Sequence, residues 1–302
     1  MKKISDVRVV ATSFSVSIID VVFNFVVAIF TGSTVMLAQA LQGMSDLITG
    51  GILYFGVKRS KRKATSLYQF GYGREVFFWV LMAGILMFIG TGGLSFYFGW
   101  QQFTNPHPIE NVGLAFAMLL IGITANAYAL SLSVHRLKYL YKGFSWWHQL
   151  RHSSAAETKA TFLIDILGTS SAIFGFVALV VFVLTNNPQF DGLGSMVIGL
   201  SMMGMSMLLL RDVRDFIVGR AVEPHIAERI IGAAQSVKGV QDILDLRTMY
   251  LGSSSILVIL EVHLRDGLET NEIEAITDNV KEVSGSPYNG HLVSTVVTVQ
   301  YN

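Results

Sequence analysis

The sequence predicts a polytopic α-helical membrane protein with six transmembrane helices and a small C-terminal α+β domain. Hydrophobic residues make up 52% of the 302 residues and charged residues only 14%, against about 25% charged in an average soluble protein. Lys and Arg are absent from residues 9–57, 75–135 and 160–210, which hold the long apolar runs. After Arg211 the composition becomes that of a soluble protein. We therefore expect a membrane domain over residues 1–215 and a cytoplasmic domain over residues 216–302.

Six apolar segments have the length of about 20 residues that a helix needs to cross a bilayer. They cover residues 9–31, 35–57, 76–99, 112–134, 160–184 and 192–211. The N-terminal sequence MKKISDVR leads into the first of them without a small-residue cleavage site. We interpret this segment as a retained first helix rather than a signal peptide.

The basic residues of the connectors predict the orientation. The second connector carries six Lys or Arg within residues 58–74, and five more occur within residues 136–159. The first, third and fifth connectors carry none. The positive-inside rule then places both termini and the two basic connectors in the cytoplasm. We expect a multi-pass protein of a bacterial inner or plasma membrane.

The C-terminal region alternates between helical and strand patterns. Residues 223–237 and 271–283 have apolar residues at helical spacing, whereas residues 240–252, 256–264 and 291–302 have strand-like patterns. The predicted order is helix, strand, strand, helix, strand. Two helices packed on one face of a sheet are the simplest α+β arrangement for this order.

Several functional classes are excluded by composition and motif. The chain has no cysteine, so it forms no disulfide and no thiolate metal site. A net charge of +1 gives no reason to expect a nucleic-acid partner. The sequence contains no Walker loop and no Ser/His/Asp or Cys/His arrangement suited to nucleophilic chemistry. We expect neither an enzyme nor a permanently bound cofactor.

Two apolar segments each carry a polar pair at positions i and i+4, on one helical face. The pairs are Gln42 with Asp46 and Thr161 with Asp165. A carboxylate within a bilayer costs at least a few kcal/mol, so it usually faces a partner or a wet cavity. The two aspartates are therefore candidate site residues. The alternative is that they only hydrogen-bond neighbouring helices.

Other polar residues of the apolar segments are candidates for an accessory or proton-conducting role. Asp20 and Asn24 form a further i, i+4 pair in the first segment. Asp20 could supply a ligand, carry a coupled proton or serve structure. Ser45 and Asn126 are polar enough to line the same cavity, although single polar residues more often make helix contacts.

Four motifs carry a family resemblance over nearly the whole chain. TGS at 31–33, LAQAL at 37–41, FGYGRE at 70–75 and DLRT at 245–248 occur in order. The chain resembles the cation diffusion facilitator family of divalent-metal transporters, closest to its zinc-transporter-nine-like branch. The resemblance implies a metallochaperone-like cytoplasmic domain, a homodimer in a lipid bilayer, and efflux of a divalent metal. It also implies exchange of the metal for protons by alternating access.

The resemblance further implies an intramembrane metal site at Gln42, Asp46, Thr161 and Asp165. Family members usually carry Asp or His at the first position of each pair, where this chain has Gln42 and Thr161. An all-oxygen donor set suits Mn²⁺ better than Zn²⁺, with Fe²⁺ between them. All three metals remain candidates. The alternative is a paralogue with a degenerate site that senses metal or acts as a scaffold without transporting it.

The cytoplasmic domain holds three weaker metal candidates, His225, His263 and His291. Related exporters bind zinc in this domain through several His and Asp residues. Here Leu244 stands before DLRT, where such exporters have a histidine. The pattern favours isolated surface histidines.

Overall fold

The computed structural model describes residues 6–140, 156–253, 255–285 and 292–300. The chain divides into two compact units, which are described separately. The first comprises Met1–Tyr54 and Val80–Arg211, and the second comprises Phe55–Trp79 and Asp212–Asn302.

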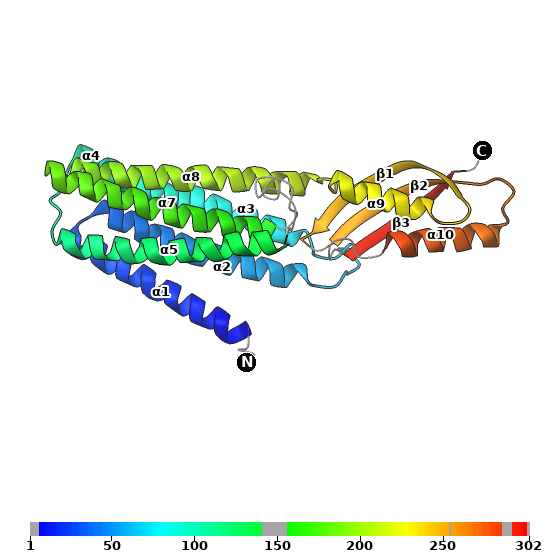
Figure 1. Cartoon of the computed structure of the whole chain (residues 1–302), viewed down its shortest axis with the longest axis horizontal. Helices are drawn as coiled ribbons and strands as arrows, with labels where there is room; N and C mark the ends of the chain where they lie inside the picture. Colours follow the sequence, from blue (N-terminus) through cyan, green and yellow to red (C-terminus); the bar gives the residue numbers. More distant parts are fainter. Residues whose placement is uncertain (1–5, 141–155, 254, 286–291, 301–302) are drawn as a thin grey trace. The chain divides into compact units, whose positions relative to one another are not determined.

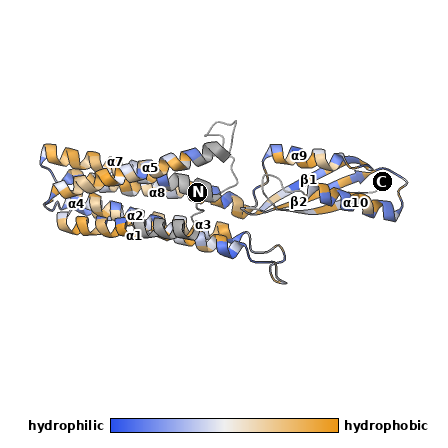
Figure 2. Ribbon diagram, turned by 60° about the horizontal axis from the view of Figure 1, so that its bottom comes forward, coloured by the Kyte–Doolittle hydropathy of each residue, from blue (hydrophilic) through white to orange (hydrophobic). Residues whose placement is uncertain are grey.

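The first unit is built from long helices, some of which extend into the second unit (Figure 1). Their bounds are α1 Asp6–Thr31, α2 Thr34–Ser60, α3 Glu75–Ile85, η1 Leu86–Gly92, α4 Gly93–Thr104, α5 Val112–Leu140, α7 Ala156–Thr185 and α8 Gln189–Val218. Most residues of these helices are hydrophobic (Figure 2). In α9 (Pro224–Gln235) and α10 (Thr270–Ser284), hydrophobic residues alternate with hydrophilic ones.

Four helical stretches of the described chain are long and apolar enough to cross a membrane. They are Glu75–Thr104, Val112–Leu132, Asp165–Thr185 and Gln189–Val218. A shorter apolar stretch, Ile18–Thr31, belongs to α1. α2 has the length of a span with 27 residues, but several of its buried side chains are polar, which lowers its hydropathy. The membrane-protein class is confirmed, and the count of six spans remains a prediction.

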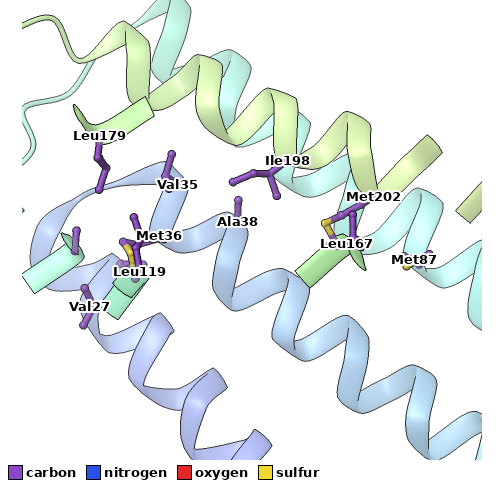
Figure 3. Close-up of a cluster of buried hydrophobic side chains, with 12 residues drawn as sticks. Val27, Val35, Met36, Ala38, Met87, Leu119, Leu167, Leu179, Ile198 and Met202 are labelled. Carbon is purple, nitrogen blue, oxygen red and sulfur yellow. The ribbon is translucent and has the colours of Figure 1, made fainter. Parts of the chain in front are cut away.

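A cluster of buried hydrophobic side chains joins these helices (Figure 3). α2 contributes Val35, Met36 and Ala38, all completely buried. Leu119 comes from α5 and Ile198 from α8. The N-terminal end of α2 therefore packs against α5 and α8 in this cluster. This packing fixes the position of α2, the helix that carries Asp46.

Helix α8 packs closely on the helix formed by α3, η1 and α4 through small residues. A Cβ atom at Gly99 would lie 2.7 Å from the carbonyl oxygen of Gly192. The hydroxyl of Ser195 donates to the carbonyl of Ser95 (2.9 Å), and that of Ser206 donates to the carbonyl of Gly84 (2.7 Å). Small side chains allow this close approach, and the hydroxyls satisfy buried carbonyls, as in other membrane helix pairs.

The N-terminus of α2 is capped by a buried carboxylate from α8. Asp191 is fully buried and accepts from the hydroxyl of Ser33 (2.5 Å) and the hydroxyl of Thr34 (2.8 Å). It also accepts from the backbone N–H groups of Thr34 (2.6 Å) and Val35 (3.3 Å). Gly32 has a φ of 67° and makes the turn that brings α2 to this position. The first N–H groups of α2, which have no partner within the helix, are satisfied here.

The second unit contains the predicted α+β fold, which is confirmed. Strands β1 (Val240–Gly252), β2 (Ser255–Leu264) and β3 (Leu292–Gln300) form one sheet in the order β1-β2-β3. β1 and β2 are antiparallel, and β2 and β3 are parallel. α10 supplies the crossover that a parallel pair requires. Ile230 of α9 and Val280 of α10 are completely buried, as expected for amphipathic helices on a sheet.

The FGYGRE segment packs against the end of β1 within this unit. A Cβ atom at Gly73 would lie 2.3 Å from the carbonyl oxygen of Leu251, so only glycine fits. Phe77 stacks on Phe216, with ring centroids 5.0 Å apart, and Phe216 meets Tyr250 edge-on at 5.5 Å. Gly73 and Leu251, which are more than 170 residues apart in the chain, thus lie in contact.

Candidate metal site in the membrane domain

The buried face of α2 is unusually polar for a helix in an apolar bundle. Gln42, Ser45 and Thr49 are each 3% exposed, and they recur at the spacing of one helical face. Asp46 lies among them. Its Oδ1 atom is buried and has no hydrogen-bond partner among the residues that the structure describes. An unpaired buried carboxylate oxygen is costly, so this position is suited to a proton or a cation.

Asp165 of α7 is the second carboxylate of the site. The carboxylate of Asp46 lies within electrostatic range of those of Asp165 and Asp20. The sequence provides no Lys or Arg within residues 9–57 or 160–210 to balance these charges. Like charges that share a poorly solvated site need a counter-ion or protons. A divalent cation would balance the charges of Asp46 and Asp165.

Gln42 is held by a residue that the sequence did not indicate. Its Oε1 atom accepts a hydrogen bond from the hydroxyl of Ser171, a fully buried residue of α7. A Cβ atom at Gly168 would lie 3.4 Å from Gln42 Nε2 and 3.1 Å from Asn126 Oδ1. The amide of Asn126 donates to the carbonyl of Gly168 (3.3 Å). α2, α5 and α7 therefore place amide and hydroxyl groups together one turn from Asp46.

Ser171 gave little signal in the sequence because it is one of several small polar residues in its helix. In the structure the hydroxyl of Ser171 contacts Gln42, 129 positions away, whereas the hydroxyl of Ser170 bonds the carbonyl of Ile166 in its own helix (2.7 Å).

Thr161 lies in α7 one turn before Asp165, and its side chain is outside the described residues. On α1, Asp20 is exposed, while Asn24 is buried and donates to the carbonyl of Asp20 (2.9 Å). A Cβ atom at Gly43 would lie 3.8 Å from Asp20 Oδ2. The carboxylate of Asp20 thus lies beside α2, next to the segment that carries Gln42 and Asp46.

The histidines of the C-terminal domain do not form a metal-binding cluster in the described chain. His225 lies 3.3 Å from the carboxylate of Glu223 and is largely exposed. His263 faces Asp242 in the register of β1 and β2, and His291 is outside the described residues. No group of three His, Asp or Glu side chains with metal-binding geometry occurs in the described residues of either unit.

Comparison with known proteins identifies the family. The profile of the cation efflux transmembrane domain matches residues 10–218. The chain belongs to the cation efflux family. This family is the one that the TGS, FGYGRE and DLRT motifs predicted. The match covers most of α1, all of the helices from α2 to α8, and both carboxylates of the site.

Several curated proteins are similar over most of this chain. The human proton-coupled zinc antiporter SLC30A9, a mitochondrial protein, is 24% identical over 284 residues, covering 91% of this chain and 50% of its own length. The magnetosome protein MamB of Magnetospira sp. (strain QH-2) is 24% identical over 294 residues, covering 91% of this chain and 92% of its own. These matches place the chain near the SLC30A9-like branch. It spans about half the length of the SLC30A9 proteins.

Among solved structures, a variant of the C-terminal domain of MamM is 20% identical, with a TM-score of 0.24. It covers 26% of this chain and 90% of its own.

The relatives are named as an antiporter and as a magnetosome protein, and the matched domain is a cation efflux domain. The classification of the chain as a non-enzyme is thus confirmed.

Proposed function

We propose that this cation efflux protein is a divalent-metal transporter that exchanges the metal for protons by alternating access. The observation that carries the proposal is the buried Oδ1 of Asp46, which has no hydrogen-bond partner in the described chain. This carboxylate lies within electrostatic range of Asp165, and both residues belong to apolar stretches, 9–57 and 160–210, without Lys or Arg. Carboxylates within membrane helices usually line an ion or proton path. One divalent cation would neutralise both.

Proton coupling follows from the shared site. A carboxylate that binds a proton no longer offers a negative charge to a metal, so protons and metal compete for Asp46 and Asp165. A cytoplasmic metal would enter the site when both are ionised and leave on the other side when they are protonated. The proton gradient would then drive efflux without a nucleotide.

The donor set supports Mn²⁺, Fe²⁺ or Zn²⁺ as the cargo. The donor atoms that Asp46, Asp165, Gln42 and Thr161 offer to a cation are all oxygens, and oxygen donors favour Mn²⁺ over Zn²⁺. The name of the human relative, a zinc antiporter, supports Zn²⁺. Because Gln42 Oε1 is already bonded to Ser171, we infer that the two carboxylates provide most of the binding energy.

We further propose a homodimer, with residues 216–302 as its cytoplasmic dimerisation and regulatory domain. Because α9 and α10 contact each other as well as β1 and β3, both helices lie on one face of the three-stranded sheet and leave the other face available for contact. The mass of the purified protein in detergent tests the stoichiometry.

The proposal is tested by metal flux into proteoliposomes, measured for Mn²⁺, Fe²⁺ and Zn²⁺ with and without a pH gradient. We expect Asp46→Asn and Asp165→Asn each to abolish flux, because loss of one charge from a poorly solvated ion pair costs about 3–5 kcal/mol. Ser206→Ala is the matched control. It removes a buried hydroxyl that bonds the carbonyl of Gly84, away from the carboxylates, and should keep flux near wild type.

Wild-type flux in either aspartate variant would contradict the site assignment. A wild-type protein that binds metal without flux for any of the three ions would favour the alternative of a metal sensor or scaffold. Flux that does not respond to a pH gradient would contradict proton coupling alone.

A further inference from the structure

Asp191 is a buried acid that the proposed transport cycle does not use. It lies in the first turn of α8, yet its carboxylate receives four hydrogen bonds from Ser33, Thr34 and Val35 at the start of α2. The N-termini of two helices therefore converge on one negative charge. Helix N-termini carry partial positive charge, so both dipoles favour the ionised carboxylate.

This contact is at the end of α2 opposite to its basic end. α2 ends with Lys58 and Arg59, which the positive-inside rule assigns to the cytoplasm. The contact of Asp191 with Ser33 and Thr34 is then at the outer end of the bundle. The assignment of this side rests on the proposed function and its orientation.

A polar stripe connects the metal site with this outer end. Asp46, Gln42, Gln39 and Val35 follow one another on α2 at intervals of four, three and four residues, so they share one face. Gln39 is 9% exposed, and its Nε2 atom has no hydrogen-bond partner within the described chain. A buried amide without a partner costs free energy, which a path for ions or water explains.

Val35 lies at the outer end of this row of residues on α2, beside Asp191. It is completely buried between two glycines of neighbouring helices. A Cβ atom at Gly175 of α7 would lie 2.7 Å from Val35 Cγ1, and one at Gly194 of α8 would lie 2.8 Å from Val35 Cγ2. Its backbone N–H is one of the donors to Asp191. Movement of α2 away from α8 would break these hydrogen bonds and withdraw Val35 together.

We propose that the Asp191 carboxylate is a latch that holds α2 on α8 and keeps Val35 across the outward path from Asp46. Asp191 is a positioning residue in this role, because it acts through α2 and does not touch the metal. Release of the latch would accompany opening to the outer side. A transporter needs such an outer closure while its site is open to the cytoplasm.

Cysteine accessibility tests the latch in the full-length protein. The chain has no native cysteine, so Gln39→Cys is a unique reporter beneath Val35. The protein is reconstituted in liposomes and treated from the outer side with a membrane-impermeant methanethiosulfonate. We expect Asp191→Asn to raise the labelling rate about tenfold or more, because hydrogen bonds to a charged group are among the stronger ones.

Metal binding separates a latch from a general structural role. If the state that is open to the outer side is a minor population, a tenfold increase in that population leaves most molecules closed on the outer side. The metal affinity, measured from the cytoplasmic side on Asp191→Asn without the reporter, should then stay within about twofold of wild type. Ser206→Ala, which also removes a buried hydrogen bond of α8, should leave the labelling rate of Gln39→Cys unchanged.

Two milder variants keep the test decisive if Asp191→Asn does not fold. Thr34→Val and Ser33→Ala each remove one hydroxyl donor and leave the carboxylate in place. Each should give a smaller rise in labelling from the outer side. Labelling equal to that of the reporter alone in all folded variants would overturn the latch, even where Asp46→Asn confirms the transport site. If the variants raise the labelling rate as expected but the wild type shows no metal flux, only the proposed transport function is overturned.

Discussion

At the residue scale, the two kinds of buried aspartate differ in how their charge is satisfied. Asp191 accepts four hydrogen bonds, one from Ser33 and three from the first two residues of α2, so its charge is balanced by the protein itself. Oδ1 of Asp46 has none within the described residues, and other carboxylates lie within electrostatic range. A carboxylate that the fold satisfies serves structure, whereas one that the fold leaves unsatisfied is available to a cation or proton.

A single substitution of Asp20 decides whether this residue carries a coupled proton. Its carboxylate lies near Gly43 and within electrostatic range of Asp46. If it carries a coupled proton, Asp20→Asn should lower the number of protons exchanged per metal. Stability should change less than this ratio does, because asparagine has nearly the shape and volume of aspartate. Metal and proton fluxes are measured together in proteoliposomes.

The matched control for Asp20 is Asp266→Asn, an exposed aspartate of the second unit. Asp266 lies between β2 and α10, outside the membrane helices, so the same chemical change there should leave the number of protons exchanged per metal unchanged. A ratio for Asp20→Asn equal to wild type would remove Asp20 from the proton path. Asp46 and Asp165 would then be the working acids.

At the element scale, the loop before α3 is held by its contact with β1. The backbone of Gly73 approaches Leu251 and Gly252 so closely that no side chain fits, and Arg59 pairs with Glu75 (2.7 Å) across the same segment. The start of α3 and the end of α2 are thereby joined to the sheet within the second unit.

Gly73→Ala should destabilise this segment by about 1–3 kcal/mol, the usual cost of forcing extra volume into a packed site. We expect a lower midpoint of thermal unfolding for the purified protein in detergent. Gly50→Ala is the control, because a Cβ atom there meets nothing within 4 Å and alanine favours a helix. Equal midpoints for Gly73→Ala and wild type would contradict this close packing.

At the scale of the whole molecule, the connectors define the orientation in the membrane. Ala64 lies in the basic connector after α2, and Asn105 follows α4 in a connector without Lys or Arg; both are exposed. We expect Ala64→Cys to react with an impermeant thiol reagent from the cytoplasmic side only, and Asn105→Cys from the outer side only. The cysteine-free wild type gives the background. Reaction of both positions from one side would refute the predicted topology.

The sequence by itself determined the class of protein, the family and most of the elements. Long apolar runs without Lys or Arg specify membrane helices, because bilayer thickness and the cost of charge act on each segment separately. β1 begins and ends where the pattern of residues 240–252 predicted, since strand periodicity is local. Asp46 and Asp165 were identified as candidates for the same reason: a carboxylate in an apolar segment is visible without knowing its neighbours.

Only the tertiary structure decided which polar groups meet. Ser171 holds Gln42 across 129 residues, and Asp191 binds Ser33 across 158. In the sequence Asp191 is one polar residue of a connector, and Gly73 is one glycine of a short motif. Their roles depend on helix and strand positions that many distant hydrophobic contacts determine together. Such contacts leave no periodic pattern along the chain, because the residues of each pair belong to different elements.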